Sequence, residues 1–167
     1  FYGNAVRITP RQHPEICAIV SETATALGIK NLPDVFIYNS GGLMNALAIR
    51  FVGKSHVVLF SALVDNMLLR GARTELKSII AHELGHHAAG HTSPWKGLLL
   101  LPVKCIPFLS NFYSRCCEYT CDRISYAIVG DKEAVQRSLL TLAHGTQSLA
   151  DKSDLGEFCA QEREIPG

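Results

Sequence analysis

The six residues HELGHH at positions 82–87 place three imidazoles and one carboxylate inside a segment with the pattern of an ordinary helix, Thr74–Ala89. Residues four apart on a helix share one face, with their Cβ atoms about 5–6 Å apart. His82 and His86 are therefore expected to point the same way and to reach a single ion. Gly90 follows the predicted helix directly and is a typical stop.

This spacing of histidines suits zinc, which takes imidazole nitrogens as ligands at about 2.0–2.1 Å. Glu83 projects beside the two histidines, where its carboxylate can hydrogen-bond a metal-held water instead of binding the metal. In zinc hydrolases such a carboxylate is the general base that removes the proton before the water attacks a polarised carbonyl. The pattern predicts amide hydrolysis without a covalent intermediate.

A catalytic zinc has three protein ligands and an open position, so a third ligand is needed. The candidates are His87, His91, His144, Glu118, Asp122 and the cysteines of the next long predicted helix, Cys116, Cys117 and Cys121. His87 points about 100° away from His86 and is expected on the surface. His91 is interpreted as a cation near the negative end of the helix. The three cysteines diverge round their helix and are interpreted as small buried side chains.

Glu118 and Asp122 lie one turn apart on one face of the predicted helix Ser110–Val129. Zinc-binding histidines usually donate their second ring N–H to a carboxylate or a carbonyl. This pair therefore offers a ligand, Glu118, and a carboxylate, Asp122, that orients a histidine. The alternative is that the two acids only solvate an exposed helix face, and the upstream motif favours the first interpretation.

Composition predicts a single compact domain over residues 1–167, because apolar residues make up 47% of the chain and charged residues 19%. The net charge of +1 and the lack of a basic cluster with interleaved aromatic residues argue against nucleic acid as a partner. Six cysteines, three of them crowded into one predicted helix, favour reduced thiols and hence the cytoplasmic side. No signal peptide is visible, and Phe1 in place of Met suggests a piece of a longer chain.

Periodicity predicts an α+β fold, mainly helical with a small antiparallel sheet. Strands are predicted at 35–38, 45–51 and 56–60 as a meander. Helices are predicted at 13–27, 61–69, 74–89 with Thr74 as N-cap, 110–129, and from an Asp131 cap to about 143, followed by a frayed segment at 146–164.

Three motifs resemble the HtpX-like and CAAX-prenyl-protease family of zinc metalloendopeptidases. They are NALA (45–48), HELGHHAAGH (82–91) and SRCCEYTCDRISYAIVG (114–130), which occur in the family's order. The resemblance implies a zincin-like fold with one Zn²⁺ held by His82, His86 and Glu118, with Glu83 as the base and Asp122 behind the ligands. It also implies that Asn45, Ala46, Leu47 and Ala48 form a strand that pairs with the substrate backbone, as an exposed sheet edge can.

The sequence departs from this family at four points. Leu47 stands where phenylalanine is usual, and Cys121 replaces a small alanine before Asp122. The family's His-Pro segment and its late arginine are missing, since His144 is followed by Gly145. Either the sequence ends before these residues or its oxyanion donor differs, in which case Tyr126, two turns after Glu118, is a candidate.

The expected function is that of a zinc-dependent endopeptidase acting on unfolded or membrane-associated polypeptide. The alternative is a latent or chaperone-like peptide-binding module that retains a structural metal. The apolar stretch 97–109 holds two prolines and a lysine, so it is too short and too broken to span about 30 Å of hydrocarbon. It is expected either to touch a membrane surface or to pack over the site as a lid.

Overall fold

The computed structural model describes residues 3–51, 54–100 and 106–161. The strands are β1 (Ala5–Arg7), β2 (Asp34–Tyr38), β3 (Ala46–Phe51) and β4 (Lys54–Phe60). The helices are α1 (Pro14–Ala26), α2 (Ser61–Leu69), α3 (Arg73–Ala88), α4 (Pro94–Leu99), α6 (Pro107–Val129), α7 (Lys132–His144), α8 (Gln147–Ala150) and α9 (Leu155–Gln161). The predicted mainly helical α+β class is confirmed.

The sheet differs from the predicted antiparallel meander. Its order is β1-β2-β4-β3, in which β2 and β4 are parallel while β1 with β2 and β3 with β4 are antiparallel. The run Val57–Leu59 is buried throughout, as expected of a central strand covered on both faces. β4 therefore lies between β2 and β3, and this leaves β3 at an edge of the sheet. β1 was not predicted from its short, largely exposed sequence.

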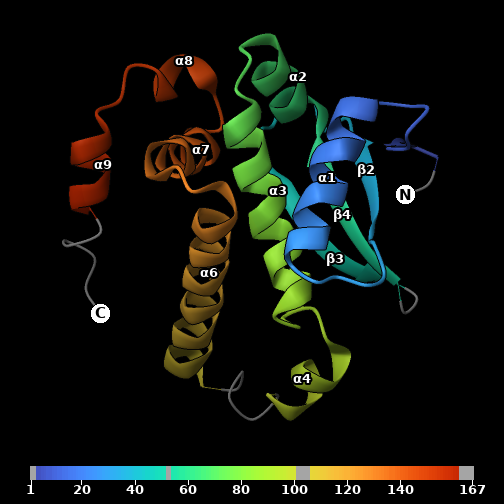
Figure 1. Ribbon diagram of the computed structural model, residues 1–167. Helices are drawn as coiled ribbons and strands as arrows, with labels where there is room; N and C mark the ends of the chain where they lie inside the picture. The colour runs from blue at the N-terminus through green and yellow to red at the C-terminus, as the bar shows by residue number, and fades with distance from the viewer. Residues whose placement is uncertain (1–2, 52–53, 101–105, 162–167) are drawn as a thin grey trace.

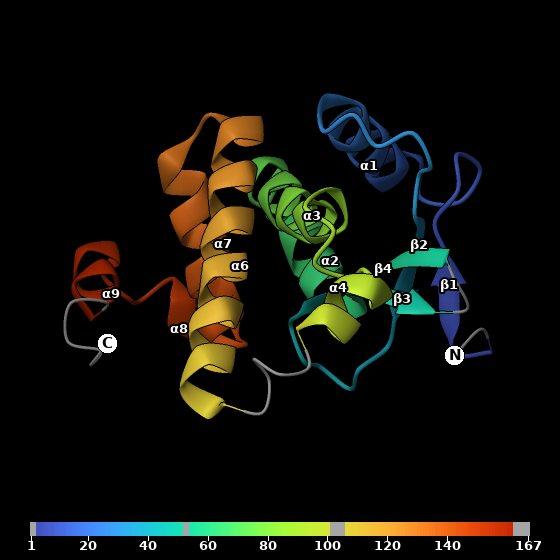
Figure 2. The same ribbon diagram turned by 90° about the horizontal axis from the view of Figure 1, so that it is seen from below.

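The described part of the chain is arranged in three layers, which Figure 1 shows with the sheet on the right, α3 in the centre and α6 and α7 on the left. α1 and the sheet pack against α3 on one side, and α6 and α7 pack against it on the other. Figure 2, seen from below, shows the same separation. The main apolar cluster joins α1, α2, α3 and the sheet, and includes the fully buried Ile19, Leu63 and Ile80. α3 is therefore held from both sides, which fixes the direction of the side chains that it carries.

Helix ends agree in part with their sequence signals. Asp131 caps α7 by accepting a hydrogen bond from the Ala134 N–H at 3.1 Å, and Gly130 ends α6 with a φ of 72°. The prediction of Thr74 as the N-cap of α3 is wrong, because α3 begins at Arg73 and its N-cap, Ala72, makes no side-chain hydrogen bond. The first turn of α3 is instead anchored by packing, since Leu76 is fully buried.

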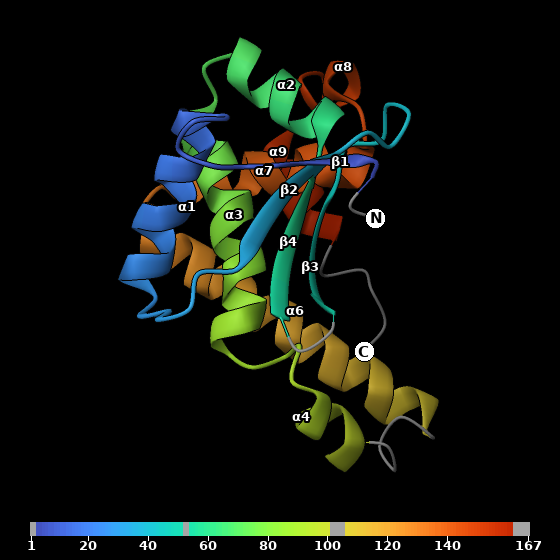
Figure 3. The same cartoon turned by 90° about the vertical axis from the view of Figure 1, so that its right-hand side faces the viewer.

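The apolar stretch 97–109 contains the end of α4 and the start of α6, while residues 101–105 lie outside the described residues. α4 and the first turns of α6 extend beyond the body of the molecule at its lower end in Figure 3. Within the described residues, every helix is too short or too polar to cross a bilayer.

Candidate active site

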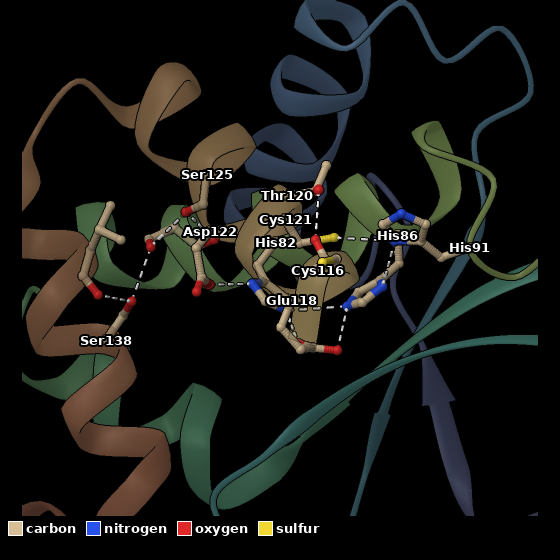
Figure 4. Close-up of polar contacts among 12 residues, drawn as sticks. His82, His86, His91, Cys116, Glu118, Thr120, Cys121, Asp122, Ser125 and Ser138 are labelled. Atoms are coloured by element: carbon tan, nitrogen blue, oxygen red, sulfur yellow. Dashed lines mark hydrogen bonds and ion pairs between the residues drawn. The ribbon is translucent and has the colours of Figure 1, made fainter. Parts of the chain in front are cut away.

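The first contact between the two motif helices joins His82 of α3 to Asp122 of α6. The Nδ1 atom of His82 lies 2.9 Å from Oδ1 of Asp122, and Figure 4 shows the two side chains pointing toward each other. An ionised carboxylate can only accept, so Nδ1 carries the proton and donates it. In the neutral ring the Nε2 atom of His82 then presents its lone pair.

That lone pair faces two further electron-rich groups. Nε2 of His82 lies 3.1 Å from Oε2 of Glu118 and 3.2 Å from Nε2 of His86. Nε2 of His86 is in turn 3.6 Å from Oε1 of Glu118. Two imidazole nitrogens and a carboxylate that converge in this way favour a positive charge between them, and the donor set is one that zinc accepts. These residues therefore fit the metal that the sequence predicts.

The pKa values of the two histidines are shifted in opposite directions. Burial lowers the pKa of His82, but its hydrogen bond to Asp122 and the surrounding carboxylates outweigh this and raise the pKa overall. For His86, burial is again the largest cause and the pKa is lowered, in spite of the attraction of Glu118. His86 is thus held in its neutral form, the form that binds metals.

Glu83 lies beside this cluster and is 8% exposed. Burial, helped by the charge of Glu118, raises the pKa of its carboxyl group to about 7, although His82 and a hydrogen bond from the backbone N–H of Ala48 act against the shift. A carboxyl group with a pKa near neutrality is well suited to take up and release a proton in general base catalysis. The Ala48 contact also ties Glu83 to the edge strand β3.

A cavity of about 440 Å³ contains the cluster and Glu83. Asn45 and the first three residues of β3 form one of its sides, and α3, α6 and α7 supply most of the rest. Because β3 is an edge strand, the cavity opens beside backbone groups that can pair with an extended chain. All four residues predicted for a substrate strand, Asn45, Ala46, Leu47 and Ala48, thus lie beside the predicted base.

Comparison with known proteins gives one family. The model of peptidase family M48 matches residues 10–100, more than half of the chain. The chain belongs to peptidase family M48. It is 28% identical over 176 residues to the plastoglobule-localized metallopeptidase 48, chloroplastic, of Arabidopsis thaliana, and the match covers 96% of this chain and 49% of that protein. The chain therefore spans about half the length of the curated relative that it matches, and no solved structure matches significantly.

The M48 match confirms the predicted family and covers the helix with His82, Glu83 and His86 as well as the edge strand. The match ends before α6. We therefore include Glu118 and Asp122 in the candidate site because of their contacts with the two histidines. The register of α6 explains these contacts. Residues 118, 122 and 125 fall on one face of that helix, and all three line the cavity.

A second set of groups also offers metal ligands in this M48 domain, since ligand atoms of His82, His86 and Cys121 lie within 4.8 Å of one another. Glu118 makes the more direct contacts with the two histidines, at 3.1 Å from Nε2 of His82 and 3.6 Å from Nε2 of His86. Nε2 of His86 faces Glu118, whereas Cys121 lies 3.6 Å from Nδ1 of His91, which is itself in contact with the opposite ring nitrogen of His86. Burial also raises the pKa of the Cys121 thiol to about 12, which disfavours the thiolate that binds metals.

The remaining histidines of the motif have separate places. His87 points away from the cluster, with its Nε2 atom 3.1 Å from the backbone carbonyl of His56 on β4. His91 was interpreted from the sequence only as a cation near a helix end, but it lines the cavity, and its Nδ1 atom lies 3.2 Å from Nδ1 of His86. The sequence signal for this contact is the separation of five residues between His86 and His91. The spacing alone does not predict the contact, because the contact depends on the turn that follows α3.

Tyr126, the predicted candidate for the oxyanion donor, is half exposed and is not among the residues that line the cavity. Eight residues after Glu118, the helix has turned about 80° beyond two full turns, which directs Tyr126 away from the metal ligands. Ser125, one residue earlier, takes the position on the cavity face.

Proposed function

We propose that this M48 domain is a zinc-dependent metalloendopeptidase in which Glu83 is the general base. The observation that carries the proposal is the convergence of Nε2 of His82, Nε2 of His86 and the Glu118 carboxylate next to the buried Glu83. His82, His86 and Glu118 would hold one Zn²⁺, and Asp122 would keep the His82 ring oriented through its Nδ1–H. A zinc ion held there would supply Lewis acidity, which would acidify water and polarise a carbonyl.

The chain's own residues move the protons. The Glu83 carboxylate accepts a proton from the attacking water, whose oxygen forms a bond to the carbonyl carbon of the substrate. The same carboxyl group then donates that proton to the amide nitrogen as the C–N bond breaks. A pKa near 7 allows both steps at neutral pH, and the hydrogen bond from Ala48 keeps the carboxylate in place.

The substrate would be a polypeptide in an extended conformation. An extended segment can add to the free edge of β3, where residues 45–48 line the cavity. A folded protein rarely offers a free segment of this length. The expected substrates are therefore unfolded or membrane-associated polypeptides. Pairing with β3 would use the backbone of an internal segment of the substrate, and we therefore propose cleavage within a chain rather than at its end.

The test compares the native protein with Glu83→Gln, which removes the base and keeps the shape. Both forms are expected to bind about one zinc per chain, measured by elemental analysis, and only the native form to cleave casein. Equal cleavage by both would defeat the mechanism. Full zinc content without any cleavage would instead support the alternative, a latent or chaperone-like module with a structural metal.

We further propose peripheral contact with a lipid surface at the lower end of the molecule. Large apolar side chains are exposed there on α4 and the first turns of α6, and they include Trp95 at 77%, Leu99 at 79% and Phe108 at 68% exposure. These elements extend beyond the body of the molecule (Figure 3), and we propose that their exposed apolar side chains enter the headgroup region. Tryptophan favours such interfaces because its ring is apolar and its N–H is polar.

Flotation with phospholipid vesicles tests this contact. The native protein is expected to float with the vesicles, and the double variant Trp95→Ser, Leu99→Ser to remain in the dense fraction. Leu69→Ser is the matched control, because Leu69 is 80% exposed but lies on α2 at the other end of the molecule. Flotation that is equally lost in the control, or kept in the double variant, would contradict the proposal.

A further inference from the structure

A second cavity, of about 720 Å³, shares no lining residue with the cavity of the candidate active site. It lies between the loop that follows α1, the first residues of β2 and β4, and the ends of β3 and α3. Four basic residues line it, Arg7, Lys30, Arg50 and Lys54, together with one acid, Asp34. We call this cavity the basic pocket.

The acid of the basic pocket is already paired. Asp34 forms an ion pair with Arg7 of the neighbouring strand β1. Lys30 and Lys54 are exposed, and neither forms an ion pair with another described residue. The whole chain carries a net charge of only +1, so the gathering of positive charge in this cavity is a local feature.

Neutral hydrogen-bond donors also line the basic pocket. Asn31 contributes an exposed amide and Ser55 a half-buried hydroxyl. Amide, hydroxyl and ammonium groups all donate to the oxygen atoms of phosphate and sulfonate groups, and the bonds from charged donors are the stronger ones. A cavity of this size falls within the range of sites that hold small molecules. The basic pocket therefore suits an anionic group that carries several oxygen atoms.

Two simpler roles explain part of this lining. A basic residue such as Arg50 on the edge strand β3 hinders pairing with another chain. A cation near the end of α3 also interacts favourably with the helix dipole. Neither role requires Lys30, from the loop after α1, to line the same cavity as Lys54, from the start of β4. The convergence of the two lysines is left for a ligand to explain.

The basic pocket lies at the end of the molecule from which α4 projects. β2 and β4 are parallel neighbours, and Figure 3 shows their first residues and the end of α3 at the lower end of the sheet. His87 connects the two regions. It lines the basic pocket, and its Nδ1 atom lies 3.1 Å from Oγ1 of Thr92, two residues before α4 begins.

Exposed apolar side chains accompany the basic pocket at this end. Leu32, which is 51% exposed, lines the pocket itself, and Leu98 and Leu99 are exposed on α4. A lipid carries a negative group and acyl chains in one molecule and can use both kinds of surface, whereas an acidic peptide would use only the charge. Basic groups are attracted to an anionic lipid surface within a Debye length, about 8–10 Å. A lipid surface is therefore the occupant that these residues fit best.

We propose that the basic pocket binds the anionic headgroup of a lipid, through its phosphate or sulfonate oxygen atoms, and gives the domain a preference for anionic lipid surfaces. This inference rests on the proposed lipid contact and deepens it. Lys30 and Lys54 are the main determinants, because each is exposed and forms no ion pair with another described residue. Binding there concentrates the domain where membrane-associated polypeptides, the proposed substrates, are found.

The test compares binding to neutral phosphatidylcholine vesicles with binding to vesicles that contain about 30% phosphatidylglycerol. The native chain is expected to prefer the anionic vesicles by at least about 20-fold. Each basic residue near such a surface contributes about 5-fold, so the double variant Lys30→Gln, Lys54→Gln should lose about 20-fold on these vesicles alone. Lys30→Arg, Lys54→Arg keeps both charges and should keep the preference.

The matched control is Lys132→Gln, Lys152→Gln, which removes the same charge from two exposed lysines outside the basic pocket. An equal loss in this control, or equal binding of the native chain to both vesicles, would overturn the inference. A soluble glutamate-rich peptide provides a further arm. If it binds through Lys30 and Lys54 while the vesicles are not distinguished, the basic pocket is a site for acidic peptides and the lipid assignment is wrong.

Failure of this inference can be separated from failure of the proposed functions. Binding to neutral vesicles reports on the apolar contact of α4 and α6, and Trp95→Ser, Leu99→Ser affects it without changing the charge of the basic pocket. Vesicle binding also requires no cleavage. A chain that cleaves nothing but distinguishes the two vesicles through Lys30 and Lys54 still supports the basic pocket, and an active peptidase that does not distinguish them refutes it.

Discussion

His86 and His91 face each other through their Nδ1 atoms, which are 3.2 Å apart. Since Nε2 of His86 faces Glu118 and His82, a metal-binding His86 must carry its proton on Nδ1. That proton can be donated to the Nδ1 lone pair of His91. His91 thereby stands to His86 as Asp122 stands to His82, as a partner that sets the tautomer and the ring orientation.

The first prediction concerns His91 itself. His91→Phe keeps a ring but removes the acceptor, and we expect zinc affinity to fall about 10- to 100-fold, as for other partners of metal-bound histidines. His91→Asn, which keeps an acceptor oxygen, should lose less. Competition with a chromophoric chelator gives the dissociation constants. Wild-type affinity in His91→Phe would show that the contact does not support His86.

The second prediction ranks Glu118 above His91. Glu118→Ala removes a proposed ligand, whereas His91→Ala removes only the support of one, so zinc should be retained more weakly in Glu118→Ala. The retention is measured as zinc per chain after dialysis against a graded series of chelator concentrations. Glu133→Ala is the control, because Glu133 forms an exposed ion pair with Arg137 on α7. The reverse ranking would mean that Glu118 is not the third ligand.

The third prediction concerns the metal-free protein at different pH values. Burial raises the pKa of Glu83 from 4.5 to about 7, so the folded state holds this proton more tightly than the unfolded state. Stability is therefore lost as the pH rises from 4.5 through 7. One pKa unit corresponds to about 1.4 kcal/mol, so the loss amounts to as much as about 3 kcal/mol.

Urea unfolding with excess chelator at pH 5 and pH 8 measures this effect. Glu83→Gln cannot ionise, and its advantage over the native chain should grow between the two pH values by about 1–3 kcal/mol. The other groups that titrate are common to both proteins, so their contributions cancel in the difference in stability between the variant and the native chain. An advantage that is constant with pH would mean that Glu83 is not kept neutral by burial.

The fourth prediction concerns Gly85, where α3 passes close to α6. A Cβ atom at this position would lie 3.4 Å from Sγ of Cys121 and 3.4 Å from Cγ2 of Ile124, which is just within ordinary contact. Gly85→Ala should therefore be tolerated and can gain up to about 1 kcal/mol from helix propensity. Gly85→Leu should cost about 1–3 kcal/mol and displace α6.

Thermal unfolding and zinc affinity together test the Gly85 prediction. Ala143→Leu on the exposed side of α7 is the matched control for adding a large side chain to a helix. Gly85→Leu should lose zinc affinity as well as stability, because α6 carries Glu118 and Asp122 to the histidines of α3. If Gly85→Leu were destabilised but kept its zinc affinity, zinc binding would not depend on the distance between α3 and α6.

Much of the fold could be predicted because helix signals are local. The end of α6 at Gly130 and the Asp131 cap of α7 were read directly from residue type. The order of the strands could not be read in this way. β4 lies between β2 and β3 and runs parallel to β2. This order depends on which strand is covered on both faces.

The sequence by itself determined the pairing of His82 with His86 and the position of Glu83 beside them, because the helical repeat alone places residues four apart on one face. Only the tertiary structure decided that Glu118 and Asp122 reach these rings and that His91 returns to His86. The physical reason is that these contacts join residues whose proximity depends on how α3 and α6 pack and on the turn after α3. No local periodicity specifies that packing.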